Sequence, residues 1–283
     1  MIVRSAPAKI NLALHVVGQR SDGYHLLDTL VTFADIGDTI TVEPDETLTL
    51  SISGPFAAQL DGDADANLVM RAARLLADVA QSSGRSRPGA HIGLEKTLPI
   101  ASGVGGGSAD AAATLHALND LWQLGLDVAA LSQIGLPLGA DIPMCLAAEP
   151  ARVTGIGEHV APGPRLPDHA LLLINPRVPV ATPHVFRGLT RRDHPPMPEL
   201  PEAWRDLDHL VDWLQPTRND LQPAAETIAP EITEVLTVMR DLPGCQFARM
   251  SGSGATCFGI FADGGAIEAA NVVRGIRPEW WVG

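Results

Sequence analysis

The sequence predicts an α+β fold in two domains, and three observations lead to this prediction. Segments with the period of a strand are mixed with segments of helical period, and several strands follow one another through short turns, which favours α+β over a regularly alternating parallel sheet. The length of 283 residues fits two domains of ordinary size. A Pro-rich connector covers 161–167, and a new strand follows it. We therefore expect one domain at 1–160 and a second at 161–283.

Periodicity predicts the elements of the first domain. Apolar and polar residues alternate over 10–16, which is the pattern of a half-buried strand, and Ser21-Asp22-Gly23 then predicts a turn. Apolar residues after Asn67 recur at helical spacing. The expected elements are strands at 10–16, 40–42, 48–52 and 91–98, helices from Asn67 to 79 and from Ser108 to 122, and a loop at 84–89.

The second domain follows the connector with a strand at 170–174. A Pro-rich loop is expected at 193–201, helices at 207–214 and 228–239, and a strand-turn-strand unit at 250–261. No internal repeat is visible in the sequence.

The composition of the chain argues against several classes of function. Hydrophobic residues make up 46% of the chain and charged residues 19%, as in a globular protein with a sizeable core. The net charge of −13 opposes a nucleic-acid surface or a polybasic membrane patch, and no apolar run approaches a membrane span. The N-terminus has no apolar signal-peptide region, and the three cysteines form no CxxC pair. We expect a cytoplasmic protein without nucleic-acid or membrane partners.

The strongest chemical signal is a glycine-rich loop. Residues 99–112 read as the end of a strand, four glycines within five positions, and the start of a helix. Glycine lets backbone amides turn toward an anion, and the helix N-terminus adds its dipole, so the segment predicts a phosphate cradle. No Gly-Lys pair exists for a Walker A loop, and Ser108 stands where a dinucleotide fingerprint needs its third glycine.

Lysine is rare in this chain. Of the 20 cationic residues, 18 are Arg and only Lys9 and Lys96 are Lys. A position that needs a compact ammonium instead of a planar guanidinium would explain why these two differ from the rest.

The combined motifs resemble the GHMP kinase superfamily. Its ATP loop has the pattern Pro-x-x-x-Gly-Leu-Gly-Gly-Gly-Ser-Ser/Ala-Asp-Ala-Ala, which this chain matches from Pro99 with Val104 in place of Leu. Further matching segments run from residue 6 to residue 255: Ala6-Pro-Ala-Lys-Ile-Asn-Leu12, Asp22-Gly-Tyr-His25, Gly139-Ala-Asp-Ile-Pro143, Gly155-Ile-Gly-Glu158, Asn219-Asp-Leu221 and Ser251-Gly-Ser-Gly-Ala255.

The resemblance implies a two-domain GHMP kinase fold with a ribosomal-protein-S5-like N-terminal domain and a ferredoxin-like C-terminal domain. It also implies ATP-dependent phosphorylation of the 2-hydroxyl of 4-diphosphocytidyl-2-C-methyl-D-erythritol, in the non-mevalonate isoprenoid pathway. Two alternatives stay open. One is a GHMP kinase that acts on homoserine, mevalonate or a sugar, against which Asp22-Gly-Tyr-His25 argues as a nucleoside contact. The other is a catalytically silent nucleotide-binding regulator, against which intact Lys9 and Asp141 argue.

The family's catalytic pair corresponds to Lys9 and Asp141. A carboxylate at the acceptor hydroxyl can take its proton, while a nearby ammonium keeps the carboxylate ionised and offsets phosphoryl charge. A carboxylate is a weak base, so proton transfer is expected late in a loose phosphoryl transfer. Without the resemblance, Asp141 followed by Pro143 reads as the N-cap of a helix.

For ATP, the resemblance implies Asn67, Lys96 and the glycine loop. Asn67 also fits a helix cap, and Ser108 fits a cap or a ligand of phosphate or metal. The chemistry implies Mg²⁺, but no carboxylate cluster in the sequence indicates a dedicated site, so no metal ligand is assigned. The expected loop residues are Pro99, Ile100, Ala101, Ser102, Gly103, Val104, Gly105, Gly106, Gly107, Ser108 and Ala109.

For the acceptor, the resemblance implies Tyr24, His25 and Phe186, and Asn11 is a candidate because it shares a strand face with Lys9. Aromatic rings that stack on a base contribute about 1 to 3 kcal/mol per stack. A structural strand residue is the alternative for Asn11, and core packing is the alternative for Phe186.

Overall fold

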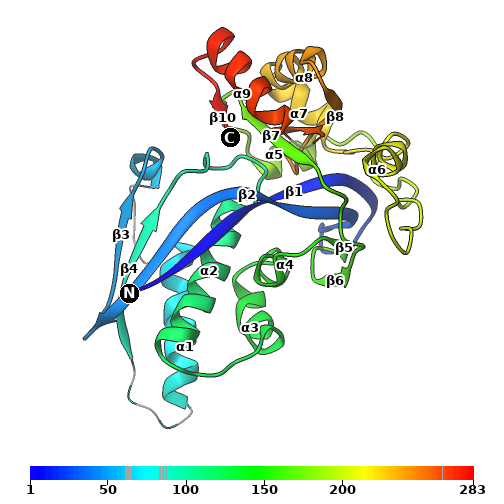
Figure 1. Cartoon of the computed structure of the whole chain (residues 1–283). Coiled ribbons are helices and arrows are strands. Elements are labelled where there is room, and N and C mark those ends of the chain that lie inside the picture. The colour runs from blue at the N-terminus through cyan, green and yellow to red at the C-terminus, as the bar shows by residue number, and fades with distance from the viewer. Residues whose placement is uncertain (61–65, 83, 85, 87, 263) are drawn as a thin grey trace. The chain divides into compact units, whose positions relative to one another are not determined.

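The computed structural model describes residues 1–60, 66–82, 84, 86, 88–262 and 264–283. The chain forms two compact units, and neither is one continuous stretch. The first unit contains 1–9, 34–100 and 105–148, and the second contains 10–33, 101–104 and 149–283. Two long strands, β1 (Ile2–Gln19) and β2 (His25–Asp45), therefore contribute to both units (Figure 1). The expected domain boundary between residues 160 and 161 stays a prediction.

The first unit combines part of a sheet with a group of helices. The second half of β2 pairs antiparallel with β4 (Gly89–Glu95). The strand β3 (Leu48–Ser53) pairs parallel with β4. The helix α1 (Leu68–Ser82) connects β3 to β4 and packs along α2 (Gly106–Leu121) (Figure 1). The remaining elements are the 3-10 helices η1 (Ala57–Leu60) and η3 (Leu136–Leu138) and the helices α3 (Val128–Gly135) and α4 (Ile142–Ala147).

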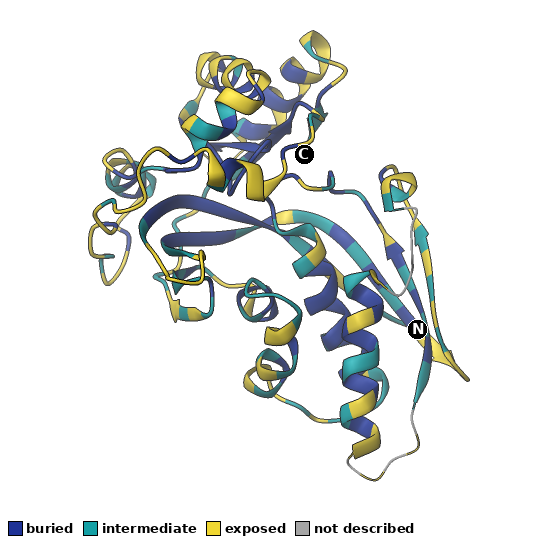
Figure 2. Cartoon of the chain, turned by 180° about the vertical axis from the view of Figure 1, so that it is seen from behind, coloured by how far each residue is buried: buried dark blue, intermediate teal, exposed yellow. Residues whose placement is uncertain are grey.

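The core of the first unit follows from the sequence pattern. Buried residues of α1 recur every three or four positions, so one side of the helix faces the core and the other faces solvent (Figure 2). In β4 the buried residues are Ala90, Ile92 and Leu94, which alternate as expected for a strand with one covered face.

In the second unit, the first part of β2 pairs antiparallel with β5 (Ala151–Gly155), which pairs with β6 (His159–Pro162). A separate four-stranded antiparallel sheet has the order β10-β7-β9-β8. Its strands are β7 (Ala170–Asn175), β8 (Cys245–Met250), β9 (Cys257–Phe261) and β10 (Trp281–Val282). The helices are α5 (Thr182–Arg187), α6 (Leu207–Leu214), α7 (Gln222–Ile228), α8 (Glu231–Asp241) and α9 (Gly265–Ile276).

The order of elements around this sheet is that of a ferredoxin-like fold. One strand is followed by helices, then by two strands, one helix and a last strand. The first strand β7 lies between the last strand β10 and the third strand β9. The predicted mixture of helices and antiparallel strands is therefore confirmed.

Several predicted boundaries differ from the structure. The helix expected at 228–239 is wrong at its start, because Pro230 holds Ala229 out of the helical region (φ −133°, ψ 88°) and separates α7 from α8. The helix expected from Ser108 begins two residues earlier, at Gly106. The loop expected at 84–89 includes residues 85 and 87, which lie outside the described residues. No helix in the described part of the chain is both long and apolar enough to cross a membrane.

Candidate active site

The glycine-rich loop ends in the uncapped start of a helix. Ala101, Gly103 and Gly105 have positive φ values of 51°, 77° and 65°, which favour glycine at the last two positions. Gly105 is the N-cap residue of α2, and no described side chain caps this helix. The first amides of α2 are therefore left to bind a ligand or water. Ser108 is the third residue of the helix and not its cap.

Both lysines of the chain contact this loop. A Cβ atom on Gly105 would lie 3.3 Å from Cε of Lys9, and a Cβ atom on Gly106 would lie 3.1 Å from Nζ of Lys96. The two glycines thus leave room for the two lysine side chains. Both lysines are buried, with 7% and 3% of their surface exposed, so neither is a surface charge left by chance.

The predicted catalytic pair lies close together. Nζ of Lys9 donates a hydrogen bond to Oδ2 of Asp141 at 3.3 Å. Asp141 stands at the N-cap position of α4, but its carboxylate does not cap that helix among the described residues. The side chain of Asp141 is 38% exposed. The carboxylate is therefore paired with an ammonium on one side and accessible to a ligand on the other.

Lys96 belongs to a buried triad with two carboxylates. Its ammonium donates to Asp38 and, at 2.7 Å, to Asp110. Burial alone would lower the pKa of Lys96, but the charges of Asp110 and Asp38 outweigh it and raise that pKa. Burial also raises the pKa of Asp110 to about 7, with Asp38 adding to the rise against the attraction of Lys96.

Sequence reasoning missed the two carboxylates of this triad. Asp110 lies inside the glycine-loop pattern, which was a usable signal, whereas nothing in the local sequence marks Asp38. Oδ1 of Asp38 accepts hydrogen bonds from the amides of Thr97 and Leu98 at 2.6 and 2.8 Å. Asp38 thus fixes the chain that leads from β4 into the glycine loop.

Asn67 caps a helix, as its position predicted. Its Oδ1 accepts a hydrogen bond from the amide of Val69 at 2.9 Å, at the start of α1. Its role near a nucleotide stays a prediction.

In the second unit, the middle of the loop contacts the turn between β8 and β9. A Cβ atom on Gly103 would lie 2.4 Å from the carbonyl oxygen of Ser251, so only glycine fits there. Oγ of Ser251 donates to the carbonyl of Gly103 at 3.0 Å and accepts from the amide of Asn11 at 3.1 Å. The amide of Thr256 donates to the carbonyl of Ser102 at 3.1 Å. Ser251 begins the matching segment 251–255, and the sequence predicts no role for it.

Four other residues of the loop are buried, namely Pro99, Ser102, Val104 and Ala109. Ile100 is partly buried, and Gly107 is exposed at the start of α2.

Asn11 has an unsatisfied acceptor. Its Nδ2 donates to Oγ1 of Thr29 at 2.8 Å, and Thr29 in turn donates to the carbonyl of Ala13 at 2.6 Å. Oδ1 of Asn11 is buried and has no hydrogen-bond partner among the described residues. A buried acceptor without a donor costs stability, which is typical of a functional position.

Two of the predicted aromatic residues stack on each other. The rings of His25 and Phe186 lie 4.8 Å apart between centroids, with an angle of 23° between their planes. Burial, and then the charge of Arg192, lowers the pKa of His25. No base fits between two rings at this distance, so a base would stack on an outer face or separate them. Tyr24 is 61% exposed on the neighbouring turn.

Comparisons with known proteins agree with this fold. A family model described as GHMP kinases N terminal domain matches residues 67–149, and one described as GHMP kinases C terminal matches residues 197–274. An antiparallel ferredoxin-like unit and a glycine loop flanked by a Lys–Asp pair define a class of small-molecule kinase. The chain belongs to the GHMP kinase family.

Individual relatives have more specific names than the two family models. The chain is 52% identical to a 4-diphosphocytidyl-2-C-methyl-D-erythritol kinase of Cereibacter sphaeroides over 98% of its own length and 96% of the relative's. It is 53% identical to the protein of the same name from Ruegeria pomeroyi, over 98% and 95%. A crystal structure of 4-(cytidine 5′-diphospho)-2C-methyl-D-erythritol kinase has a TM-score of 0.81 at 35% identity, covering 100% of this chain and 98% of that one. A homoserine kinase of Cytophaga hutchinsonii shares the fold, with a TM-score of 0.69 at 16% identity over 99% and 93%.

Proposed function

We propose that the chain transfers the γ-phosphoryl group of ATP to the 2-hydroxyl of 4-diphosphocytidyl-2-C-methyl-D-erythritol, a step of the non-mevalonate isoprenoid pathway. The hydrogen bond between Lys9 and Asp141 beside the glycine loop is the observation that carries this proposal. The names of the relatives that match the whole chain supply the acceptor.

In this reaction one oxygen–phosphorus bond forms and another breaks. The acceptor oxygen bonds to the γ-phosphorus, the bond from that phosphorus to the β–γ bridging oxygen breaks, and ADP leaves. The accessible carboxylate of Asp141 takes the proton of the hydroxyl, and the ammonium of Lys9, 3.3 Å away, offsets the negative charge beside it. Because a carboxylate is a weak base, the proton moves late, once the oxygen has begun to bond to phosphorus.

The donor phosphates would bind the start of α2. Uncapped amides at Gly106 and Gly107 and the hydroxyl of Ser108 offer hydrogen bonds to an anion there. Lys96 donates to Asp38 and Asp110. We therefore propose that Lys96 supports the loop, while the amides of Gly106 and Gly107 and the hydroxyl of Ser108 bind the phosphates. Asn67 would contact the nucleotide while it caps α1.

We also propose that ATP brings Mg²⁺ with it. Within the described part of the chain, no three His, Cys, Asp or Glu side chains come together as metal ligands. The residues present do not form a dedicated metal site, so the phosphates would supply much of the coordination. The ion would offset phosphate charge when bound.

For the acceptor, Asn11, Tyr24, His25 and Phe186 are the proposed ligands. The buried, unpartnered Oδ1 of Asn11 would accept a hydrogen bond from an acceptor hydroxyl. The cytosine would stack on Phe186 or on Tyr24, outside the pair that Phe186 forms with His25. Three free cysteines among the described residues fit the cytoplasm, where we propose that the reaction occurs.

An ADP-release assay with a panel of acceptors tests this function. The cytidine-linked methylerythritol should support turnover with Mg²⁺, whereas homoserine and mevalonate should not. Equal turnover with either of these two compounds would assign the chain to another branch of the family. ATP binding without turnover of any acceptor would indicate a silent regulator.

A further inference from the structure

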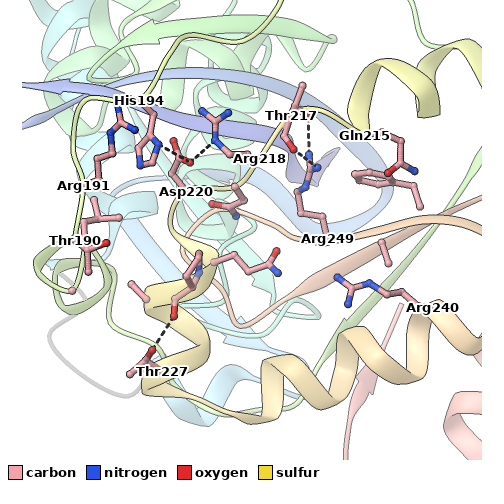
Figure 3. Close-up of a pocket in the computed structure, with 18 of the residues that line it drawn as sticks. Thr190, Arg191, His194, Gln215, Thr217, Arg218, Asp220, Thr227, Arg240 and Arg249 are labelled. Atoms are coloured by element: carbon pink, nitrogen blue, oxygen red, sulfur yellow. Dashed lines mark hydrogen bonds and ion pairs between the residues drawn. The ribbon is translucent and has the colours of Figure 1, made fainter.

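The second unit contains a cavity that we have not assigned to the kinase reaction. Its volume is about 790 Å³, which suits a small-molecule ligand. Its walls come from the segments 188–194 and 215–220 and from α7, the end of α8 and β8 (Figure 3). None of the residues that we propose for ATP or acceptor binding lines this cavity.

The cavity walls are strongly basic in a chain whose net charge is −13. Four arginines, Arg191, Arg218, Arg240 and Arg249, face one aspartate, Asp220. His194 also lines the cavity. Such local excess of positive charge attracts an anionic ligand in an otherwise acidic protein.

Arg249 is buried without a carboxylate. Its guanidinium donates to the carbonyls of Leu12, Leu214 and Thr217 and to Oγ1 of Thr217, at 2.7 to 3.1 Å. It also lies 4.5 Å from the centroid of the Phe247 ring. All these partners are neutral, so the charge is hydrogen-bonded but not neutralised. Burial lowers the pKa of Arg249 to about 10, and the charges of Arg218 and Arg240 act in the same direction.

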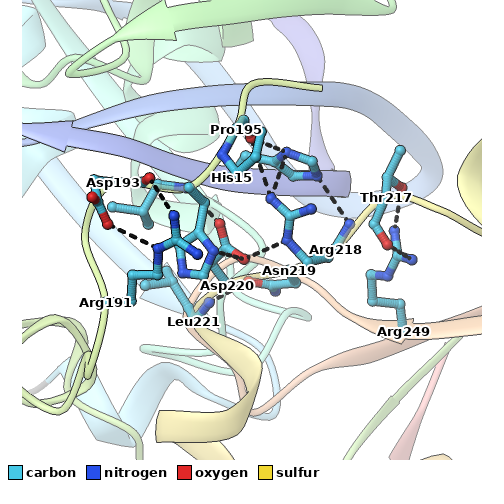
Figure 4. Close-up of polar contacts among 12 residues, drawn as sticks. His15, Arg191, Asp193, Pro195, Thr217, Arg218, Asn219, Asp220, Leu221 and Arg249 are labelled. Carbon is cyan, nitrogen blue, oxygen red and sulfur yellow. Dashed lines mark hydrogen bonds and ion pairs between the residues drawn. The ribbon is translucent and has the colours of Figure 1, made fainter. Parts of the chain in front are cut away.

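The carboxylates close to the cavity already have partners. Asp220 accepts from Nε of Arg218 at 2.9 Å (Figure 4). It also accepts from the amide of Val16 at 2.8 Å. Asp193 accepts from Arg191 at 2.9 Å, and Glu226 accepts from Gln222 at 2.9 Å. Arg240 has no ion pair within the part of the chain that the structure describes. Arg249 likewise forms no ion pair there, so the charges of Arg240 and Arg249 can attract an anion.

Arginine side chains lie on different sides of the cavity. Arg191 comes from the loop after α5, whereas Arg240 comes from α8 on the other side (Figure 3). Thr190 also lines the cavity and offers a hydroxyl. A single small anion would reach one side only, whereas a ligand with two linked anionic groups would reach both.

We propose that this cavity binds a diphosphate group, either as inorganic pyrophosphate or as the diphosphate of an organic ester. Arginine is suited to this role because its planar guanidinium donates two parallel hydrogen bonds to phosphate oxygens. Leu189, Pro223 and Phe247 line the same cavity and would contact the organic part of an ester.

Calorimetric titration of the full chain with pyrophosphate at constant ionic strength tests this proposal. A saturating non-hydrolysable ATP analogue keeps the probe away from the glycine loop. The wild-type chain should bind pyrophosphate, and Arg240→Ala should weaken this binding at least about tenfold, with Arg240→Glu weakening it further. Because Arg240 is exposed, both variants should fold, which the thermal unfolding midpoint checks.

Arg205→Ala is the matched control. Arg205 is an exposed arginine of the same unit that does not line the cavity, so its loss should change pyrophosphate affinity less than twofold by the same titration. Absence of binding by the wild-type chain, or equal affinities of the wild-type and Arg240→Ala chains, would overturn the proposal. An equal loss of pyrophosphate affinity in Arg205→Ala would also overturn the proposal, because the loss in Arg240→Ala would then come from the change in net charge alone.

Two further probes define the ligand. Inorganic phosphate should bind about tenfold more weakly than pyrophosphate, and equal affinities would contradict a site with cations on two sides. Methyl diphosphate separates the two sources: affinity at least equal to that of pyrophosphate supports an ester, and weaker binding supports inorganic pyrophosphate.

Discussion

Nζ of Lys9 lies 3.3 Å from Oδ2 of Asp141, although 132 residues separate the two in the chain. Gly105 allows this contact, because any larger residue would meet the stem of Lys9 at 3.3 Å. The ammonium, the carboxylate and the glycine loop therefore depend on one another.

Asp141→Asn and Lys9→Arg should each lower kcat by about 10²- to 10⁴-fold, the range for losing a positioned proton acceptor or charge stabiliser. The arginine keeps the charge but replaces the compact ammonium with a larger planar guanidinium. Steady-state kinetics measure the effect, and circular dichroism checks the fold.

Asp127→Asn is a matched control for Asp141→Asn. Asp127 stands at the N-cap of α3 and accepts a hydrogen bond from the amide of Ala130 at 2.8 Å, so it has a structural role only. Its change should leave kcat within about twofold, since asparagine also caps helices well. Near wild-type activity of Asp141→Asn would remove Asp141 from the reaction.

Gly105→Ala should weaken ATP binding. Gly105 has φ of 65°, and the new methyl group would press on Lys9. Gly125→Ala is the control, because Gly125 has φ of 69° but open space around it. Both changes should lower the unfolding free energy by about 1 to 2 kcal/mol, because alanine is disfavoured in the left-handed backbone conformation. Only Gly105→Ala should raise the KM for ATP, and equal KM values in the two variants would argue against the loop as donor site.

The raised pKa of Asp110 predicts a pH dependence of stability. Its folded pKa of about 7 lies above the ordinary value of 3.8, so the folded state binds more protons than the unfolded state between these values. Asp110 should therefore lower the unfolding free energy as pH rises from about 4 to 7, by at most about 1.4 kcal/mol per pH unit. In Asp110→Asn this contribution disappears, so urea unfolding should show a shallower decline over that window. Parallel pH profiles of the two chains would contradict the raised pKa.

Phe186→Ala should weaken CDP binding by roughly 5- to 150-fold, because a stack on a base contributes about 1 to 3 kcal/mol. Phe186→Leu separates stacking from packing, since leucine keeps an apolar contact with the neighbouring core but offers no ring. Both variants should lose CDP affinity in calorimetry while binding of an ATP analogue stays the same. Full CDP affinity in Phe186→Leu would assign Phe186 to core packing.

Local sequence was enough to predict the glycine loop, because positive φ values and a helix start depend on adjacent residues. It also predicted the cap at Asn67, which depends on a contact over two residues. The partners of Lys96 were missed in part because Asp38 lies 58 residues away and enters the triad only through the fold. The stacking of His25 on Phe186 was missed for the same reason, although both rings were expected near the base.

The most direct test of the central claim is the identity of the reaction product. The full chain is incubated with ATP, Mg²⁺ and 4-diphosphocytidyl-2-C-methyl-D-erythritol, and the product is analysed by phosphorus-31 and carbon-13 NMR. We expect a new phosphomonoester whose phosphorus couples to carbon 2 of the methylerythritol, formed in equal amount with ADP. A phosphomonoester at another carbon, or ADP formed without a phosphorylated acceptor, would contradict the proposed function.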